Sequence, residues 1–184
     1  MANYEQGLPI VINNEGGYVN DSTDKGKETY QGISRANWPN WEGWVEIDRI
    51  KQQRKIAFNE IILNLWPLVK RFYKLNFWDT NKLDQINNQQ IANEIFDTGV
   101  NMGISKGVKF LQEALNLLNK NQKEYNDIAE DGIIGTITIN LTNNHKNQIA
   151  LLKTINGLQF MKYVEICDRD KSQEKFFYGW LNRT

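Results

Sequence analysis

The sequence of 184 residues is poor in the residue types that build disulfide, metal and nucleophilic centres. Its one cysteine, Cys167, cannot form an intramolecular disulfide, and Met161 and Val164 near it predict a buried thiol in a helix. Its one histidine, His145, lies in the polar run 143–147, which is typical of a solvated loop. A Ser–His–Asp or Cys–His enzyme would depend on that imidazole, and a histidine-rich zinc site lacks ligands. We therefore expect neither a metal nor another cofactor.

The sequence also lacks an excess of charge and a long apolar run. Lysine plus arginine and aspartate plus glutamate both number 22, so the net charge is zero, whereas nucleic-acid-binding proteins usually carry a basic face. No apolar segment reaches the roughly 18 residues of a membrane-spanning helix. Residues 1–14 contain no basic stretch followed by a long apolar run, so we expect no signal peptide. The oligomeric state is left open.

Aromatic residues, by contrast, are frequent at 11% of the chain, and flat aromatic faces suit both protein cores and sugar rings. Trp38, Trp41 and Trp44 cluster around Pro39. They fit either a platform for a sugar or a local hydrophobic cap, and we favour the cap.

Apolar spacing predicts helices along most of the chain. The first contains Leu8, Val11 and Ile12. Pro9 fits only in its first turn, and the glycine pair at 16–17 ends it. The polar segment 18–33 predicts an irregular loop or a small β-hairpin, and Ser34 is placed to cap a short helix that stops before Pro39.

The later helices follow from longer apolar stripes. One stripe, which Pro67 should kink or split, comprises Phe58, Ile61, Ile62, Leu65, Leu68, Val69 and Phe72. The next starts at Ile91, Ile95 and Phe96 and is interrupted by Gly99 and Gly103. A further stripe comprises Val108, Leu111, Leu115 and Leu118. A short helix is expected after Gly135, and a longer one follows with Leu158, Met161 and Val164. Because no useful stretch alternates like a strand, the class is mainly α.

The segment 15–33 carries residues that suit chemistry on a glycosidic bond. Glu15 ends the first helix, and the two glycines after it permit a sharp turn and close approach to a ligand. Asp24 and then Thr29 follow in the hairpin segment. Hydrolysis needs one protonated carboxyl for the leaving oxygen and a second polar group that holds a water or stabilises positive charge.

Each of these residues also has a structural interpretation. Asp24 is either a catalytic helper or a turn residue that bonds to backbone N–H groups, and Thr29 either orients a water or favours a strand. Tyr18 and Tyr30 either contact sugar or pack beneath the loop. A calcium loop is not expected, because the glycine that such loops require is missing and Gln31 replaces the closing glutamate.

The run 15–33 resembles the signature of glycoside hydrolase family 108, a family of bacterial and phage N-acetylmuramidases. The matching residues are Glu15, Gly16, Gly17, Tyr18, Asp24, Gly26, Thr29, Gly32 and Ile33. The resemblance implies that Glu15 is the catalytic residue, and the order Glu, Asp, Thr is also similar to phage-type lysozymes. Lys25 stands where the family often has proline, which we expect to change the stiffness of the loop rather than the chemistry.

The similarity continues through the chain. NFWDTNKLDQI and IANEIFDTGVNMG resemble the family's later helices, whereas LQEALNLLN, DGIIGTIT and FFYGWLNR resemble a peptidoglycan-binding domain often fused to it. This implies a mainly α, lysozyme-like fold with a muramidase domain at 1–96 and a helical peptidoglycan-binding domain at 97–184, packed as one globule. The expected substrate contacts are Tyr18, Tyr30, Gln31, Asp97 and Asn101. Asp97 also fits a residue that holds a loop through hydrogen bonds.

The implied reaction is hydrolysis of the β-1,4 bond between N-acetylmuramic acid and N-acetylglucosamine in peptidoglycan. Glu15 would protonate the glycosidic oxygen, and Asp24 with Thr29 would position water or stabilise the oxocarbenium-like state. We expect inversion, because no second glutamate stands out as a nucleophile. The alternatives are a lytic transglycosylase, which forms anhydro ends without water, and a wall-binding module without activity, against which the intact Glu15, Asp24 and Thr29 set argues.

The resemblance also implies a place of action. The chain would act at the bacterial cell wall or periplasm, in a setting like that of a phage or prophage endolysin. Since no signal peptide is expected, it would be made in the cytoplasm and leave through a holin-like or dedicated export route. Its partners would be the glycan strand and, if the second half grips them, the peptide stems.

Overall fold

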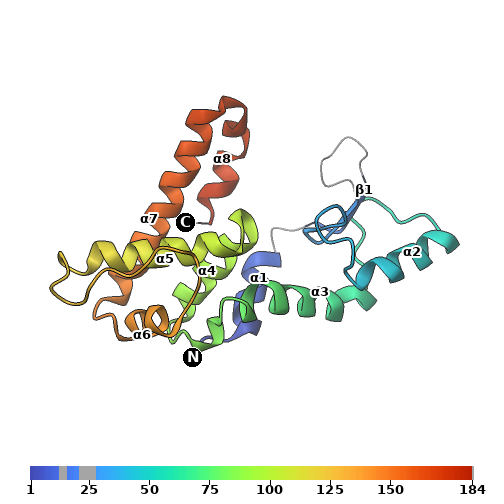
Figure 1. The fold of residues 1–184 in the computed structure, drawn as a ribbon. Coiled ribbons are helices and arrows are strands. Elements are labelled where there is room, and N and C mark those ends of the chain that lie inside the picture. The colour runs from blue at the N-terminus through green and yellow to red at the C-terminus, as the bar shows by residue number, and fades with distance from the viewer. Residues whose placement is uncertain (13–15, 21–27, 184) are drawn as a thin grey trace. The chain divides into compact units, whose positions relative to one another are not determined.

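The computed structural model describes residues 1–12, 16–20 and 28–183, so the predicted catalytic residues Glu15 and Asp24 lie outside it. The chain divides into two compact units (Figure 1). We call Leu8–Asn76 the sheet unit, and Met1–Gly7 together with Phe77–Thr184 the helical unit. The division between domains that the sequence predicts, at residues 96 and 97, falls within a helix of the helical unit and stays a prediction.

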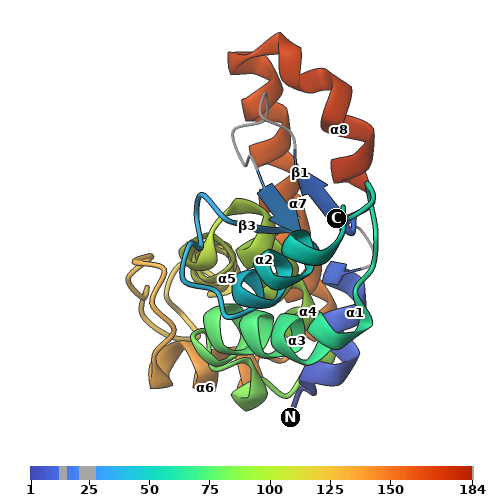
Figure 2. The ribbon, with the colours of Figure 1, turned by 90° about the vertical axis from the view of Figure 1, so that its right-hand side faces the viewer.

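The sheet unit contains a small antiparallel sheet with the strand order β1-β2-β3 (Figure 2). Its elements after helix α1 (Tyr4–Ile12), which begins in the other unit, are β1 (Tyr18–Asn20), β2 (Glu28–Tyr30), β3 (Ile33–Ser34), α2 (Gly43–Gln53), the 3₁₀-helix η1 (Leu63–Leu65) and α3 (Trp66–Tyr73). The hairpin predicted after the first helix is thus confirmed, with one more strand than expected.

The helical unit is built almost wholly from helices. They are the π-helix η2 (Lys74–Asp79), whose first residues belong to the sheet unit, η3 (Leu83–Gln85), α4 (Gln89–Met102), α5 (Ile104–Leu118), α6 (Thr136–Asn144), α7 (Gln148–Arg169), η4 (Lys171–Gln173) and α8 (Glu174–Leu181). The central helices α4, α5 and α7 pack against one another (Figure 1). Together the two units confirm the mainly α class. None of the helices seen in the described residues has the length and apolar character to span a membrane.

The turn between β2 and β3 explains one glycine of the sequence motif. Gln31 and Gly32 both have positive φ, 43° and 76°, between the paired residues Tyr30 and Ile33. Two successive residues with positive φ form the type of tight turn that matches the twist of a hairpin, and glycine adopts this conformation without strain. A positive φ is less favourable for glutamine than for glycine. Gln31 is held in this conformation by the Tyr73 hydroxyl, which donates to its carbonyl oxygen at 2.8 Å.

The backbone at Gly17 lies directly against the segment that follows α2. Its N–H donates to Asn59 Oδ1 at 2.5 Å, the Tyr18 N–H donates to the Glu60 carbonyl at 3.0 Å, and the Asn59 N–H donates back to the Tyr18 carbonyl at 2.7 Å. A Cβ on residue 17 would lie 2.5 Å from the carbonyl oxygens of Asn59 and Glu60. This close approach therefore requires glycine.

Two local predictions near the start of the chain are wrong. Helix α1 starts at Tyr4, so Pro9 lies inside it rather than in its first turn. The side chain of Asn3 accepts a hydrogen bond from the Glu5 N–H at 2.9 Å, an interaction that fixes this early start. Ser34 does not cap a helix: it ends β3, and its carbonyl oxygen accepts a hydrogen bond from the Trp38 N–H at 2.8 Å.

The predicted helix of residues 58–72 is shorter than expected. Helix α3 begins at Trp66, and Pro67 lies in its first turn, where its missing N–H has no cost. Phe58 and Ile61, which the apolar stripe assigned to this helix, lie before it and are 81% and 51% exposed. Sequence spacing also missed α2, whose buried residues include Trp44, Ile47 and Ile50.

In the helical unit the elements are largely as predicted, but their details differ. Helix α4 passes through Gly99 and ends at Met102, and the residue after it, Gly103, has a φ of 103°. Helix α7 exists, yet Met161 is exposed, and its buried face comprises Leu151, Ile155, Gln159, Tyr163 and Cys167. The buried face contains polar residues whose partners come from α4, which apolar spacing alone does not reveal. The predicted burial of Cys167 is confirmed.

Polar residues of α4, α7 and the C-terminal segment form a buried cluster. Arg183 forms an ion pair with Asp97 at 2.6 Å, and both side chains are largely buried. The Thr98 hydroxyl donates to Glu94 at 3.1 Å, and the fully buried amide of Gln159 lies 2.9 Å from Thr98 and 3.1 Å from Glu94. Burial first, and the charge of Asp97 second, raise the pKa of Glu94 to about 7.

Gly17→Ala should lower the free energy of unfolding by about 1–3 kcal/mol, because the added Cβ would overlap the backbone of residues 59–60. Gly157→Ala in α7 is the control: its Cβ meets no atom within 4 Å, so it should stabilise the chain by about 0.5–1 kcal/mol. Urea denaturation followed by circular dichroism measures both. Equal stability of the two variants would contradict the close packing at Gly17.

The free energy of unfolding should fall as the pH rises from about 4.5 to about 7. The folded state raises the pKa of Glu94, so in this window it binds more protons than the unfolded state, and deprotonation destabilises it. The fall is on the order of 1–3 kcal/mol. Glu94→Gln should flatten this slope, whereas the same change at the partly exposed Glu113 should leave it. An unaltered slope in Glu94→Gln, measured by urea denaturation at several pH values, would refute the assignment.

Candidate functional site

The strand register divides the predicted site residues of the sheet between its two faces. Tyr18 pairs with Tyr30, and Val19 pairs with Thr29, so the tyrosines share one face and Thr29 lies on the other. The tyrosines are buried, whereas Thr29 and Val19 are partly exposed. Among these predicted residues, Thr29 is therefore the one whose side chain lies on the partly exposed face.

On the buried face, Tyr18 joins a charged network that the sequence analysis missed. Its hydroxyl donates to Glu28 Oε1 at 2.7 Å, and burial together with this carboxylate raises the pKa of Tyr18 to about 12. The buried Glu28 also pairs with Arg35 at 2.7 Å and with Lys51 of α2 at 2.9 Å. Glu28 therefore links the sheet to α2, and its oxygens are occupied by three partners.

Arg35 extends this network to α2 and the tryptophans. Its guanidinium binds both carboxylate oxygens of Asp48, at 2.7 and 3.0 Å, and lies 4.6 Å from the centre of the Trp44 ring. The paired hydrogen bonds hold the pKa of Asp48 below its ordinary value and raise that of Arg35. The sequence signal for this network was the opposite charges of Glu28 and Arg35 at the two ends of the β2–β3 hairpin. Helix α2, which supplies their partners, was not predicted.

Tyr30 and Gln31 act as structural residues in the sheet unit. The Tyr30 hydroxyl donates to the Ile62 carbonyl at 3.1 Å and accepts from the Ile62 N–H at 2.8 Å, and its ring stacks on Trp41. Burial raises the pKa of Tyr30. Gln31 is buried, and its carbonyl binds Tyr73. The contacts of Tyr18 and Tyr30 correspond to the packing role that the sequence left open.

Asp97 and Asn101 belong to α4 of the helical unit. Asp97 is 3% exposed and forms its ion pair with Arg183, which matches the interpretation of this residue as a hydrogen-bonding anchor. The exposed Asn101 donates from Nδ2 to the Tyr163 hydroxyl at 2.7 Å. The Tyr163 ring stacks on Trp180 of α8, with ring centres 5.0 Å apart. The expected contact of Asp97 and Asn101 with substrate stays a prediction.

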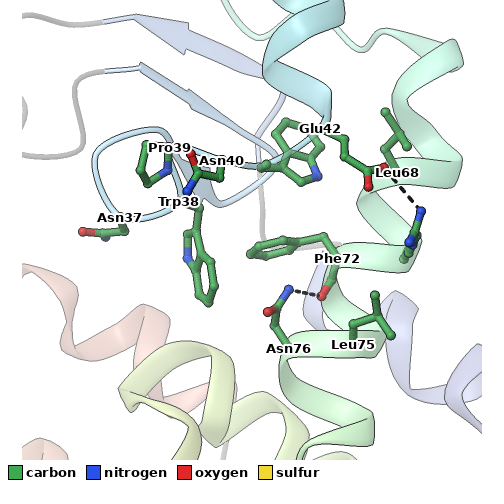
Figure 3. Close-up of a pocket in the computed structure, with 11 residues that line it drawn as sticks. Asn37, Trp38, Pro39, Asn40, Glu42, Leu68, Phe72, Leu75 and Asn76 are labelled. Atoms are coloured by element: carbon green, nitrogen blue, oxygen red, sulfur yellow. Dashed lines mark hydrogen bonds and ion pairs between the residues drawn. The ribbon is translucent and has the colours of Figure 1, made fainter.

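The described residues of the sheet unit line two hollows. One, of about 510 Å³, lies beside β1 and is lined by Tyr18, Asn20, Lys51, Arg54, Lys55, Ile56 and Phe58. The other, of about 320 Å³, lies between the loop 37–42 and α3 (Figure 3). We call this second hollow the Trp38 groove; its lining includes Trp38, Pro39, Trp41, Phe72 and Leu75.

The tryptophan cluster is mainly the hydrophobic cap that the sequence favoured. Trp41 and Trp44 are buried and pack edge to face, with ring centres 5.0 Å apart. Trp38 differs, because its ring is partly exposed and lines the groove. Across the described ranges, no group of three or more His, Cys, Asp and Glu side chains could hold a metal ion.

Comparison with solved structures supports the fold. The chain is similar to the structure of Brucella abortus SagA, with a TM-score of 0.66 and 20% sequence identity, over 98% of this chain and 88% of that one. The comparison with curated proteins finds no match.

Comparison with family models addresses the function. The model described as "Glycosyl hydrolase 108" matches residues 8–103, and that described as "Predicted Peptidoglycan domain" matches residues 106–184. The expected lysozyme-like arrangement with a C-terminal peptidoglycan-binding region is thus confirmed, and the two matches support a glycoside hydrolase that acts on peptidoglycan at the cell wall. Because the first of these matches covers more than half of the chain, the chain belongs to the glycosyl hydrolase 108 family.

Proposed function

We propose that this chain hydrolyses the β-1,4 bond between N-acetylmuramic acid and N-acetylglucosamine, with Glu15 as the general acid. Glu15 protonates the glycosidic oxygen as the bond breaks. Asp24 and Thr29 position the attacking water or stabilise the oxocarbenium-like state. A lysozyme activity of this kind would make the chain bacteriolytic, as expected of an endolysin.

The observation that carries the proposal is the motif of residues 15–33 inside the matched family region. Glu15 occupies the position of the family's catalytic glutamate, and directly precedes the glycine pair. The hydrogen bonds of Gly17 and Tyr18 to residues 59–60 fix the chain from the second residue after Glu15 onward. A general acid needs such a rigid support, because proton donation depends on its placement relative to the leaving oxygen.

The hydrogen bonds and ion pairs of two carboxylates in the sheet unit support inversion. A retaining enzyme needs a second carboxylate as nucleophile, whereas an inverting enzyme needs room for a water. Glu28 is occupied by Tyr18, Arg35 and Lys51. Glu60 is bound by Arg54 at 2.6 Å, and that hydrogen bond is the main cause that lowers its pKa to about 2. Neither of these two carboxylates is free to attack a sugar, which favours water as the nucleophile.

The two expected substrate contacts on α4 and the two expected domains also belong to the proposal. The positions of Asp97 and Asn101 on α4 leave the exposed Asn101 better placed to contact a ligand than the buried Asp97. We retain the muramidase domain at 1–96 and the peptidoglycan-binding domain at 97–184 as a functional division of the chain. The second domain would hold the enzyme on the wall, through the glycan or its peptide stems.

A lytic transglycosylase is the alternative whose reaction is most similar. It uses the same glutamate but closes an anhydro ring instead of adding water. A positioned polar group for water distinguishes the two mechanisms. The partly exposed Thr29, beside the motif's other residues in sequence, favours hydrolysis.

Glu15→Gln should reduce the lysis of purified peptidoglycan by at least about 100-fold, because an amide cannot donate the proton that the leaving oxygen needs. Turbidity measures the lysis, and circular dichroism checks the fold. Glu5→Gln, the same change in an exposed residue of α1, is the matched control and should retain full activity. Full lysis by a folded Glu15→Gln variant would reject Glu15 as the acid.

A further inference from the structure

We propose that the Trp38 groove is a glycan subsite that binds an N-acetylglucosamine residue. The choice of sugar rests on the proposed function, whereas the existence of the subsite rests on the groove itself. Its volume of about 320 Å³ lies at the small end of the roughly 300–1,000 Å³ typical of small-molecule sites.

One part of the groove is apolar and partly aromatic. The partly exposed Trp38 ring packs edge to face on Phe72, with ring centres 4.9 Å apart. Leu68 of α3 and Leu75 of η2 extend this surface (Figure 3). Pro39 contributes to the wall formed by the loop. Flat rings and short aliphatic groups fit the C–H face of a pyranose and the methyl of an acetamido group.

Polar groups line the rest of the groove. Asn37 and Asn40 are exposed on the loop, and Asn76 lies in η2, where its Nδ2 donates to the Phe72 carbonyl at 2.8 Å. This bond orients the Asn76 amide within the groove, as Figure 3 shows. Amides both donate and accept hydrogen bonds, which suits sugar hydroxyls and an acetamido group.

The charge of the groove selects among the sugars of peptidoglycan. Its lining holds one acid and one base, Glu42 and Arg71, and these pair with each other at 3.4 Å. The groove is therefore close to neutral. N-acetylglucosamine is neutral, whereas N-acetylmuramic acid carries a lactyl carboxylate or a peptide stem. An apolar peptide, or an apolar surface of a second copy of the chain, would bury the exposed Asn37 and Asn40 amides without offering them hydrogen bonds, which is costly.

Titration of the intact chain with tri-N-acetylchitotriose tests this proposal, with the indole N–H signals recorded by nuclear magnetic resonance. The Trp38 signal, assigned from Trp38→Phe, should shift as the sugar saturates the groove. Trp38→Ala should weaken binding at least about tenfold, because it removes the flat ring on which the sugar would stack. Trp66→Ala is the matched control, because Trp66 is also exposed, lies in the same unit and is not among the residues that line the groove.

Equal affinity in Trp38→Ala, Trp66→Ala and the unchanged chain would overturn the subsite, as would the absence of any shift at millimolar sugar. Equal binding of a glucose trimer would overturn the role of the acetamido group. All titrations are repeated in Glu15→Gln, which separates the two proposals. Binding with retained lysis in that variant would defeat only the assignment of Glu15, and loss of lysis without sugar binding at Trp38 would defeat only the subsite.

Discussion

Hydrogen bonds between the backbone of residues 17–18 and the segment 59–60 hold the region on which the proposed chemistry depends. The Gly17 N–H and both backbone groups of Tyr18 find partners there, so the strand that follows the glycine pair has a fixed path. Asn59 adopts a positive φ of 61° to make these contacts, a conformation that asparagine tolerates better than most residues. In the sequence, Gly16 alone separates Glu15 from this anchored segment.

The sheet then separates structural from chemical roles. The face with Tyr18 and Tyr30 is buried and tied to α2 and to residue 62 by hydrogen bonds and by the ion pairs of Glu28. The face with Thr29 is partly exposed. Because a buried carboxylate must be paired, Glu28 contributes rigidity rather than reactivity. In the helical unit, the pair of Asp97 and Arg183 does the same for the C-terminal segment.

Local patterns in the sequence predicted much of this arrangement. Helical spacing located α1, α4, α5 and α7, and the polar run after Gly17 indicated the hairpin. Spacing failed where a contact joins distant residues. The glycine pair was interpreted as room for a ligand, yet at Gly17 the room is taken by the backbone of residues 59–60. The buried face of α7 escaped prediction because Gln159 is buried by partners on α4, and polar residues carry no apolar signal.

The central claim is that water, held opposite a glutamic acid, completes the cleavage of the glycan. Digestion of purified peptidoglycan in ¹⁸O-labelled water, followed by mass spectrometry of the released muropeptides, tests it most directly. The account predicts one labelled oxygen at each new reducing end. Products with unlabelled anhydro-muramyl ends would contradict it and identify the reaction as a transglycosylation.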